Sequence, residues 1–244
     1  MPIAPLRQLP LWDRDEDTTQ AWRVRASARA RRLGVRVWRD GSVEIVVPPH
    51  TSAEAVARFV AQHRPWIERQ RQRCVPLPPE PFPPQRIALA ATGESWMCES
   101  SAGRRAAVVV AGDGRLLLDA GAEPARLRAA LRQWLVARAQ AAFAPPLAAL
   151  AAEMGSAFQR LQIRRQRTRW GSCSTRGTLS LNCCLLFQPP QVVRYLMVHE
   201  LAHVAHMNHS ARFWRHVARF EPRWQELDRE LVQGWRHVPR WALG

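Results

Sequence analysis

The pattern of apolar and polar positions predicts a β-hairpin followed by a helix near the N-terminus. Residues 35–38 alternate apolar and polar side chains, and residues 43–47 form a second run rich in β-branched side chains. The Asp40-Gly41 pair between them is a strong signal for a tight turn. Apolar positions then recur at helical spacing through Ile67, with Thr51 or Ser52 as the N-cap. We expect residues 1–75 to form a first, N-terminal unit.

A proline-rich segment separates this unit from the rest of the chain. Residues 76–84 contain six prolines in nine positions, which favours an extended connector. After the connector, residues 85–123 are predicted to form several short strands, because Gly93, Gly103 and the Gly112-Asp113-Gly114 turn interrupt the apolar runs.

Residues 124–244 are predicted to form the main functional unit. A first helical pattern runs from Pro124 to Phe143 and stops at Pro145-Pro146, and a second continues to about Gly155. A third runs from Gln191 to about His206. A last helix begins after Ser210 and is broken at Pro222. Strand-like segments occupy residues 161–163 and 178–187. The whole chain therefore has an α+β pattern, with a β-rich N-terminal half.

The string His199-Glu200-Leu201-Ala202-His203 lies inside the helix predicted from Gln191. Two histidines four residues apart share one helix face, so both imidazoles can reach one ion, while Glu200 can contact a water on that ion. Chance would place H-E-x-x-H in a chain of this composition in roughly 1% of cases. A buried amphipathic helix with hydrogen-bonded histidines is the alternative, and the density of histidines argues against it.

A hydrolytic zinc site needs a third protein ligand and an open position. His206 lies on the same helix face but about 10 Å along the axis from His199. His209 becomes available if Asn208 ends the helix in a left-handed conformation and the chain turns back. Geometry therefore favours His209 over His206.

Composition sets the remaining limits. The net charge of +16 comes entirely from arginine, because the chain has no lysine. The absence of lysine favours a compositional bias in which most arginines are solvated. A charge of this size would also attract nucleic acid. Five cysteines without a regular framework favour reduced thiols and a cytoplasmic location. We find no apolar stretch long enough to span a membrane, so we do not expect a membrane partner. We expect Cys173, Cys183 and Cys184 to pack as small apolar side chains, not to form a second metal site.

The chain resembles the YgjP-like metallopeptidase family, which is related to the SprT-like and WLM zinc peptidases. The resemblance rests on Arg169-Trp170-Gly171-Ser172-Cys173-Ser174, on Leu181-Asn182, on the H-E-x-x-H string, and on Asn208-His209-Ser210 followed by Phe213-Trp214. It covers about residues 20–238. Relatives often carry an acidic residue near the start of the motif helix, where this chain has Arg194.

The resemblance implies a zincin-like C-terminal unit in which a metal-binding helix lies beside a small antiparallel sheet. It implies His199, His203 and His209 as the ligands of one zinc ion per chain, and Glu200 as the catalytic base that activates a metal-bound water. Arg169, Trp170 and Asn182 are candidate substrate-binding residues, or anchors of their loop. The strand over residues 178–186 is a candidate sheet edge for an extended peptide.

The sequence leaves three functions open. The favoured one is a zinc metallopeptidase that cleaves a peptide or an unfolded protein. The first alternative is a metal-dependent nucleoside triphosphate pyrophosphatase or phosphohydrolase, in which Arg164, Arg165, Arg167 and Arg169 would hold the phosphates. The second alternative is a nucleic-acid-associated protein, for which we expect weak, non-specific binding.

Overall fold

The structure is a computed structural model that describes residues 22–38, 41–72, 80–102, 106–112 and 114–243. Contacts between Cα atoms divide the chain into residues 1–79 and residues 80–244, and each unit is described by itself. The expected Asp40 turn residue and residues 76–79 of the proline-rich connector lie outside the described residues. The molecule combines helices with several small sheets, which confirms a mixed α+β fold.

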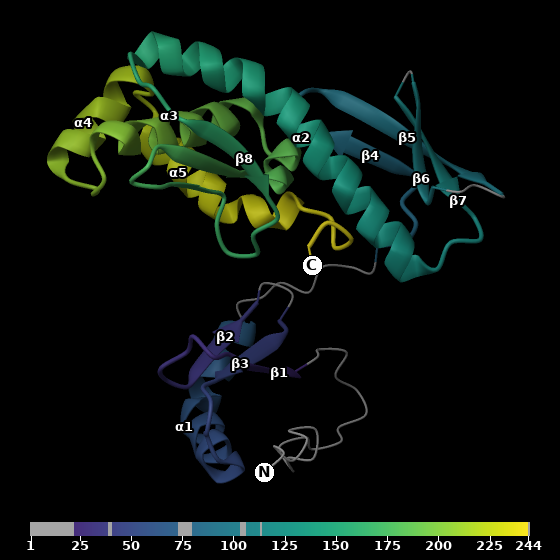
Figure 1. Ribbon diagram of the computed structural model, residues 1–244, viewed down its shortest axis with the longest axis vertical. Coiled ribbons are helices and arrows are strands. Elements are labelled where there is room, and N and C mark those ends of the chain that lie inside the picture. Colours follow the sequence, from purple (N-terminus) through teal and green to yellow (C-terminus); the bar gives the residue numbers. More distant parts are fainter. Residues whose placement is uncertain (1–21, 39–40, 73–79, 103–105, 113, 244) are drawn as a thin grey trace. The chain divides into compact units, whose positions relative to one another are not determined.

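The N-terminal unit is a three-stranded sheet covered on one face by a helix (Figure 1). Its elements are β1 (Trp22–Ala26), β2 (Gly34–Val37), β3 (Val43–Val47) and α1 (Ala53–Gln72). Strands β2 and β3 pair antiparallel, which confirms the two arms of the predicted hairpin, and Gly41 after the turn has a φ of 76°. The Ser52 hydroxyl accepts a hydrogen bond from the backbone N–H of Ala55 and caps α1.

Strand β1 was not predicted from the sequence pattern. It pairs parallel with β3, so that β3 is the central strand in the order β1-β3-β2. Alternate β3 residues Val43, Ile45 and Val47 are buried against Val56, Val60 and Ile67 of α1. This small core fixes which face of the sheet lies under the helix.

The C-terminal unit begins with a four-stranded sheet in the order β4-β5-β7-β6. Its strands are β4 (Arg86–Leu89), β5 (Glu94–Ser101), β6 (Val108–Gly112) and β7 (Arg115–Asp119). These are the short strands expected after the connector. Ile87, Leu89, Leu116 and Leu118 are buried in the core that this sheet shares with the following helix.

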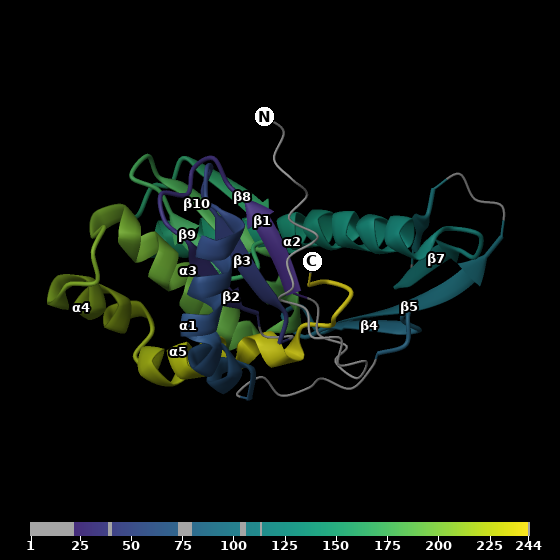
Figure 2. The same ribbon diagram turned by 90° about the horizontal axis from the view of Figure 1, so that it is seen from below.

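Helix α2 (Pro124–Met154) runs along this unit, with the β4–β7 sheet near one end and helices α3 to α5 near the other (Figures 1 and 2). The predicted stop at Pro145-Pro146 is wrong, because α2 continues through both prolines. Both prolines are exposed, whereas Phe143, Leu147 and Leu150 stay buried on the opposite side. Packing of that face therefore outweighs the local cost of the prolines. By length and apolar composition α2 could cross a membrane, and a third of its most apolar window (33%) is buried inside the molecule.

A second sheet, in the order β8-β10-β9, lies beside the motif helix. Its strands are β8 (Arg160–Arg164), β9 (Gly171–Cys173) and β10 (Thr178–Asn182). The expectation of an antiparallel sheet is wrong in part, because β10 pairs parallel with β8 and antiparallel only with β9. The connection from β8 crosses back before β10 begins, and a hydrogen bond from the Gln159 N–H to the Gly177 carbonyl aligns the two starting ends.

The strand predicted over residues 178–187 ends early. From Cys183 to Phe187 the chain forms a 3₁₀ turn, η2, because the Asn182 side chain accepts a hydrogen bond from the Cys184 N–H and starts the turn. Both Cys183 and Cys184 are buried in it, as expected for small apolar side chains. The chain then continues through α3 (Pro190–Ala205), α4 (Ala211–Phe220), α5 (Trp224–Gln233) and η3 (Gly234–His237).

Candidate metal centre

Helix α3 carries the H-E-x-x-H string, as the sequence predicts. Pro190 opens the helix at its first position, where a missing N–H costs nothing. Tyr195, Leu196, Met197 and Val198 are buried, so the residues before the motif anchor the helix in the core. The helix thereby holds both motif histidines on a rigid element.

The structure brings His199, His203 and His209 together. Their candidate ligand atoms all lie within 4.8 Å of one another, and among the described residues they form the one group of three or more metal-ligating side chains. The Nε2 atoms of His199 and His209 are 3.2 Å apart. Two nitrogens on a tetrahedral zinc, each about 2.05 Å from the ion, are about 3.3 Å apart, so this spacing fits one shared ion.

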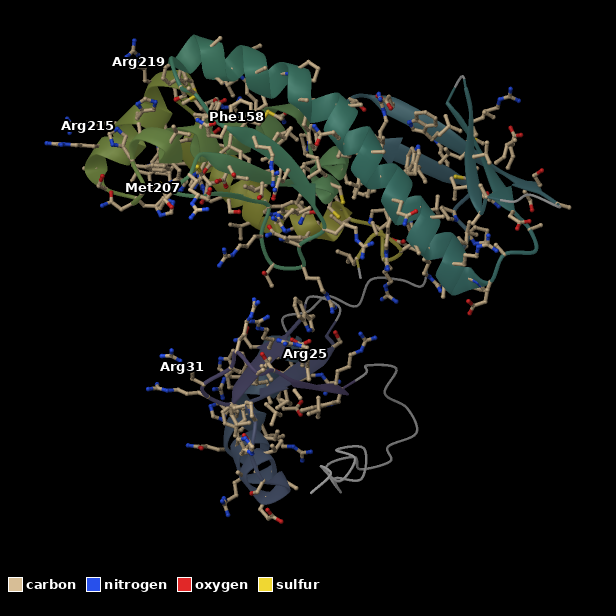
Figure 3. The ribbon with its side chains drawn as sticks, viewed as in Figure 1. Arg25, Arg31, Phe158, Met207, Arg215 and Arg219 are labelled. Carbon is tan, nitrogen blue, oxygen red and sulfur yellow. The ribbon has the colours of Figure 1, made fainter. Side chains whose placement is uncertain are left out.

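His209 reaches the cluster because α3 ends at Ala205, early enough for the chain to turn. The expectation that a left-handed Asn208 ends the helix is wrong, because Asn208 has no positive φ. His206 is the C-cap, with an extended φ of −137°, and α4 begins after Ser210. The loop between the helices includes the exposed Met207 (Figure 3). The buried Phe213 on α4 then packs against all three histidine rings, with ring centroids 4.6 to 5.0 Å apart. The His206 ring instead lies 5.6 Å from that of His216.

The imidazoles are prepared to act as neutral ligands. Burial, with smaller contributions from His203 and His209, lowers the pKa of His199 to about 3. Burial also lowers the pKa of His203. The Nδ1 atom of His203 lies 3.1 Å from the His206 carbonyl oxygen, so Nδ1–H donates there and leaves Nε2 for a metal. The donor set therefore fits a divalent ion that prefers nitrogen ligands.

Behind His199, the buried Tyr195 and the half-buried Asp228 form a chain of contacts. The Tyr195 hydroxyl donates a hydrogen bond to Asp228 Oδ1 at 2.8 Å and lies 3.5 Å from His199 Nδ1. Burial and the hydrogen bond to Asp228 raise the pKa of Tyr195, which keeps the hydroxyl protonated. Because the hydroxyl proton points to Asp228, the Tyr195 oxygen can accept a hydrogen bond from the Nδ1–H of His199. Nε2 of His199 is then directed to the cluster.

Glu200 lies beside the histidines with its carboxylate buried, only 4% exposed. Burial raises the pKa of Glu200 to about 8, and the nearby Arg169 opposes this rise. Its Oε2 atom is buried without a hydrogen-bond partner. An orphaned carboxylate oxygen beside the histidine cluster is placed to accept a proton or a hydrogen bond from a molecule at the cluster.

Strand β9 forms the wall opposite Glu200. A Cβ atom added to Gly171 would lie 2.5 Å from Glu200 Oε1 and 2.9 Å from its Cγ and Cδ atoms. Glycine at this position therefore leaves the space that the carboxylate occupies. The thiol of Cys173, two residues along the same strand, has a raised pKa because of burial and the charge of Glu200.

The three candidate substrate-binding residues occupy different environments. Arg169 is exposed and close enough to Glu200 to affect its pKa. Trp170 is buried, stacks on Trp235 with centroids 4.0 Å apart, and donates its indole N–H to the Leu231 carbonyl. Asn182 is fully buried and donates its amide to the carbonyls of Gln166 and Arg169. Trp170 and Asn182 therefore hold the loop that presents Arg169.

Sequence reasoning missed three contributors to this site. Gly171 carried a weak signal as the glycine of the string Trp170-Gly171-Ser172, and Tyr195 could be noted four residues before His199, on the same helix face. Asp228 gave no signal, because it lies on α5 and meets Tyr195 only through tertiary packing. Arg194 now has a clear role: it binds the Phe220 carbonyl and pairs with Glu153 and Glu221, which ties α3 to α2 and to the end of α4.

One comparison with known proteins shows the family of this chain. A search of curated proteins gives no match. A solved structure to which the chain is similar is that of the metallopeptidase zymogen abylysin from Pyrococcus abyssi, with 24% identity and a TM-score of 0.32, covering 44% of this chain and 99% of that chain. The family described as "YgjP-like, metallopeptidase domain" matches residues 31–233. This match spans most of the sequence, and the chain therefore belongs to the YgjP-like metallopeptidase family.

Proposed function

We propose that the protein is a zinc-dependent metallopeptidase with a zincin-like C-terminal unit. His199, His203 and His209 bind one zinc ion per chain, and Glu200 is the general base. The observation that carries this proposal is the cluster of three imidazoles whose ligand atoms lie within 4.8 Å of one another, beside the buried Glu200 carboxylate. Three protein ligands leave a fourth tetrahedral position for water and substrate, as hydrolysis requires.

Zinc is the metal that this donor set favours. Imidazole nitrogens suit zinc, copper and nickel, whereas magnesium and calcium prefer oxygen ligands. When bound, zinc would supply a Lewis acid that polarises the scissile carbonyl and makes water acidic enough to react near neutral pH. The family assignment supports the need for a metal ion.

Glu200 handles the protons. Its buried carboxylate, with Oε2 lacking a partner, can take a proton from the attacking water and deliver it to the leaving nitrogen. The raised pKa of about 8 lies close to neutrality, as suits a group that must both accept and release a proton. Because Gly171 has no side chain, the Glu200 carboxylate can occupy this position beside β9.

An extended peptide would bind along β9. The expectation that residues 178–186 provide the sheet edge is wrong, because β10 lies between β8 and β9. The Trp170 carbonyl accepts a hydrogen bond from the Asn182 N–H, and the Ser174 N–H donates to the Thr178 carbonyl, at the two ends of β10. Alternation therefore turns the N–H and C=O groups of Gly171 and Cys173 away from β10, where a substrate strand can pair with them. This edge passes directly beside Glu200.

Arg169 is the residue suited to stabilise negative charge on the substrate. It is exposed at the start of β9 and electrostatically coupled to Glu200. The other arginines proposed for a triphosphate lie elsewhere: Arg164 hydrogen-bonds Gln162, and Arg165 acts on Arg132 and Cys184. The geometry therefore favours a peptide over a nucleotide.

The test compares wild type with Glu200→Gln on two substrate classes. Both proteins, loaded with zinc, are incubated with an unfolded protein and separately with nucleoside triphosphates. We expect cleavage of the unfolded protein by wild type and loss of at least 99% of that rate in Glu200→Gln, with metal content unchanged, because the amide keeps the shape but cannot accept a proton.

The exposed Glu230→Gln on α5 is the matched control and should keep wild-type activity. Release of phosphate or pyrophosphate that depends on Glu200, without cleavage of the protein, would replace the peptidase proposal with the nucleotide one. Metal content that does not fall in a His199→Ala, His203→Ala double variant would remove the metal site itself from the proposal.

A further inference from the structure

The N-terminal sheet has one open face that carries arginines. Alternate residues of its strands face α1 and the core, so the intervening residues face the other way. On β1 these are Arg23 and Arg25, on β2 Arg36, and on β3 Glu44 and Val46. All three arginines are exposed. The face opposite α1 is therefore a basic surface built on rigid strands.

The strand register places these side chains in two adjacent rows. One row crosses the sheet as Arg23, Glu44 and Arg36, and the next as Arg25, Val46 and Gly34. Arg25 pairs with Glu44 at 3.3 Å, which leaves Arg23 and Arg36 on the two sides of a neutralised centre. Neighbouring strands lie about 4.8 Å apart, so Arg23 and Arg36 emerge about 10 Å from each other.

The loop between β1 and β2 extends this basic surface. It begins where the Ser27 N–H bonds to the Val47 carbonyl, at the end of the sheet next to Arg25. Three exposed arginines, Arg29, Arg31 and Arg32, lie in this loop. Figure 3 shows Arg31 projecting outward from the loop, away from the strands. Six arginines on the open face and this loop (23, 25, 29, 31, 32 and 36) form what we name the sheet-face arginine cluster.

Within this unit, arginine is denser in residues 22–72 than in the C-terminal unit, whereas residues 1–21 hold two arginines and four acidic residues. Residues 22–72 contain eleven arginines and four acidic residues, a net charge of +7 in 51 residues. Residues 80–244 contain twenty-two arginines and twelve acidic residues, a net charge of +10 in 165 residues. The whole N-terminal unit, residues 1–79, carries a net charge of +6, so its positive charge lies in the part that forms the strands, the β1–β2 loop and α1.

We propose that the sheet-face arginine cluster binds the phosphate backbone of double-stranded nucleic acid without sequence preference. Guanidinium groups bind phosphate oxygens with charge-assisted, often bidentate hydrogen bonds. Arginines fixed along two strands and a neighbouring loop can contact several phosphates at once. The surface would hold the peptidase near proteins that are bound to nucleic acid.

Two features of the cluster select a duplex over other polyanions. Single strands are held by several aromatic side chains on which successive bases stack. On this face the described residues place one aromatic side chain, the half-buried Trp38 that follows β2, at the end of the sheet away from the loop arginines. Membrane surfaces are bound by basic faces that also bury large apolar side chains. The large apolar side chains that are exposed in the described residues, Trp66, Met97, Val110, Met207 and Val232, all lie outside the cluster.

The experiment measures binding of the full-length protein to a labelled DNA duplex as salt is varied. Wild type should bind with a micromolar dissociation constant near 0.1 M salt. The variant Arg23→Gln, Arg31→Gln, Arg36→Gln should lose at least tenfold in affinity at that salt, and its slope of log affinity against log salt should be smaller by about 2 to 3.

The matched control removes the same charge from the other side of the same unit. Arg58→Gln, Arg64→Gln, Arg69→Gln changes three exposed arginines on α1 and should stay within about threefold of wild-type affinity. Both variants should keep wild-type peptidase activity, because none of these residues belongs to the metal centre.

The outcomes separate the cluster from general charge and from other partners. An equal loss in both triple variants would show that net charge alone attracts the duplex, and would overturn the proposal. Equal or tighter binding to a single strand, or to vesicles containing anionic lipid, would also overturn it. Peptidase activity that is absent in wild type would overturn the proposed function but leave the DNA-binding result standing on its own.

Discussion

Gly171 and Glu200 are packed so closely that a methyl group at position 171 would lie 2.5 Å from the glutamate Oε1. The strand that would receive substrate and the helix that carries the base thus meet where one of them has no side chain. This contact ties the position of the carboxylate to the position of the sheet edge. It also gives the site a residue whose effect on the base can be measured separately from metal binding.

We predict that Gly171→Ala lowers kcat at least tenfold and leaves metal content near one ion per chain. The backbone at Gly171 has no positive φ, so alanine fits the strand and the effect comes from displacing Glu200. Kinetics on a peptide substrate, with metal analysis of the same preparation, check this. Gly34→Ala is the control, because its added methyl group would meet only the Val46 Cβ at 4.0 Å. An unchanged kcat in Gly171→Ala would mean that the carboxylate can move without loss.

His209→Ala should lose most of the bound metal, whereas His206→Ala should keep it. The Nε2 atom of His209 lies 3.2 Å from that of His199, while His206 serves the cluster through its backbone carbonyl, which alanine retains. Metal content after dialysis against a weak chelator measures the difference. The reverse order of loss would identify His206 as the third ligand.

Tyr195→Phe should weaken metal binding about tenfold or more, with little effect on folding. The phenylalanine fills the same buried space but removes the oxygen that lies 3.5 Å from His199 Nδ1 and binds Asp228. Partners behind a ligating histidine typically contribute 10- to 100-fold to metal affinity. Competition with a chromophoric chelator gives the dissociation constant. Equal affinity in wild type and Tyr195→Phe would limit the tyrosine to a packing role.

The ion pair between Glu94 and Arg138 should make stability depend on acid pH. Two hydrogen bonds join Arg138 on α2 to the Glu94 carboxylate on β5, and these bonds hold the pKa of Glu94 below its ordinary value of 4.5. Because the pKa of Glu94 is lower in the folded state, the ionised carboxylate stabilises the protein above pH 4.5. This stabilisation is lost as the pH falls through the folded-state pKa of Glu94.

Urea unfolding of wild type and Glu94→Gln at pH 7 and pH 3 tests this. Both side chains of the pair are partly exposed to solvent. Between pH 7 and pH 3 we therefore expect the free energy of unfolding to fall further in wild type than in Glu94→Gln, by up to about 1 kcal/mol. Equal losses in the two proteins would show that the pair contributes nothing to the pH dependence.

The sequence by itself determined the local parts of this protein. The hairpin of β2 and β3, helix α1 with its Ser52 cap, and the position of the H-E-x-x-H string on a helix all follow from periodicity and turn chemistry within a few residues. His199 and His203 share a face because of helical geometry alone. The preference for His209 over His206 also followed from the sequence, because only a chain reversal after the helix could return a histidine to the ion.

The tertiary structure decided what depends on distant segments. Pro145 and Pro146 stay inside α2 because the opposite face of the helix is buried, which no local propensity reports. Strand β10 pairs parallel with β8 and antiparallel with β9, and its central place in the sheet makes β9 an edge strand.

The contacts that complete the site are of the same kind. Glu200 meets Gly171 across 29 residues of sequence, and Tyr195 meets Asp228 across 33. Local patterns record backbone conformation and burial of one face, but these two contacts depend on how β9 and α5 pack against α3. The sequence could therefore name the proposed ligands and the proposed base, and only the fold could show what holds these side chains in position.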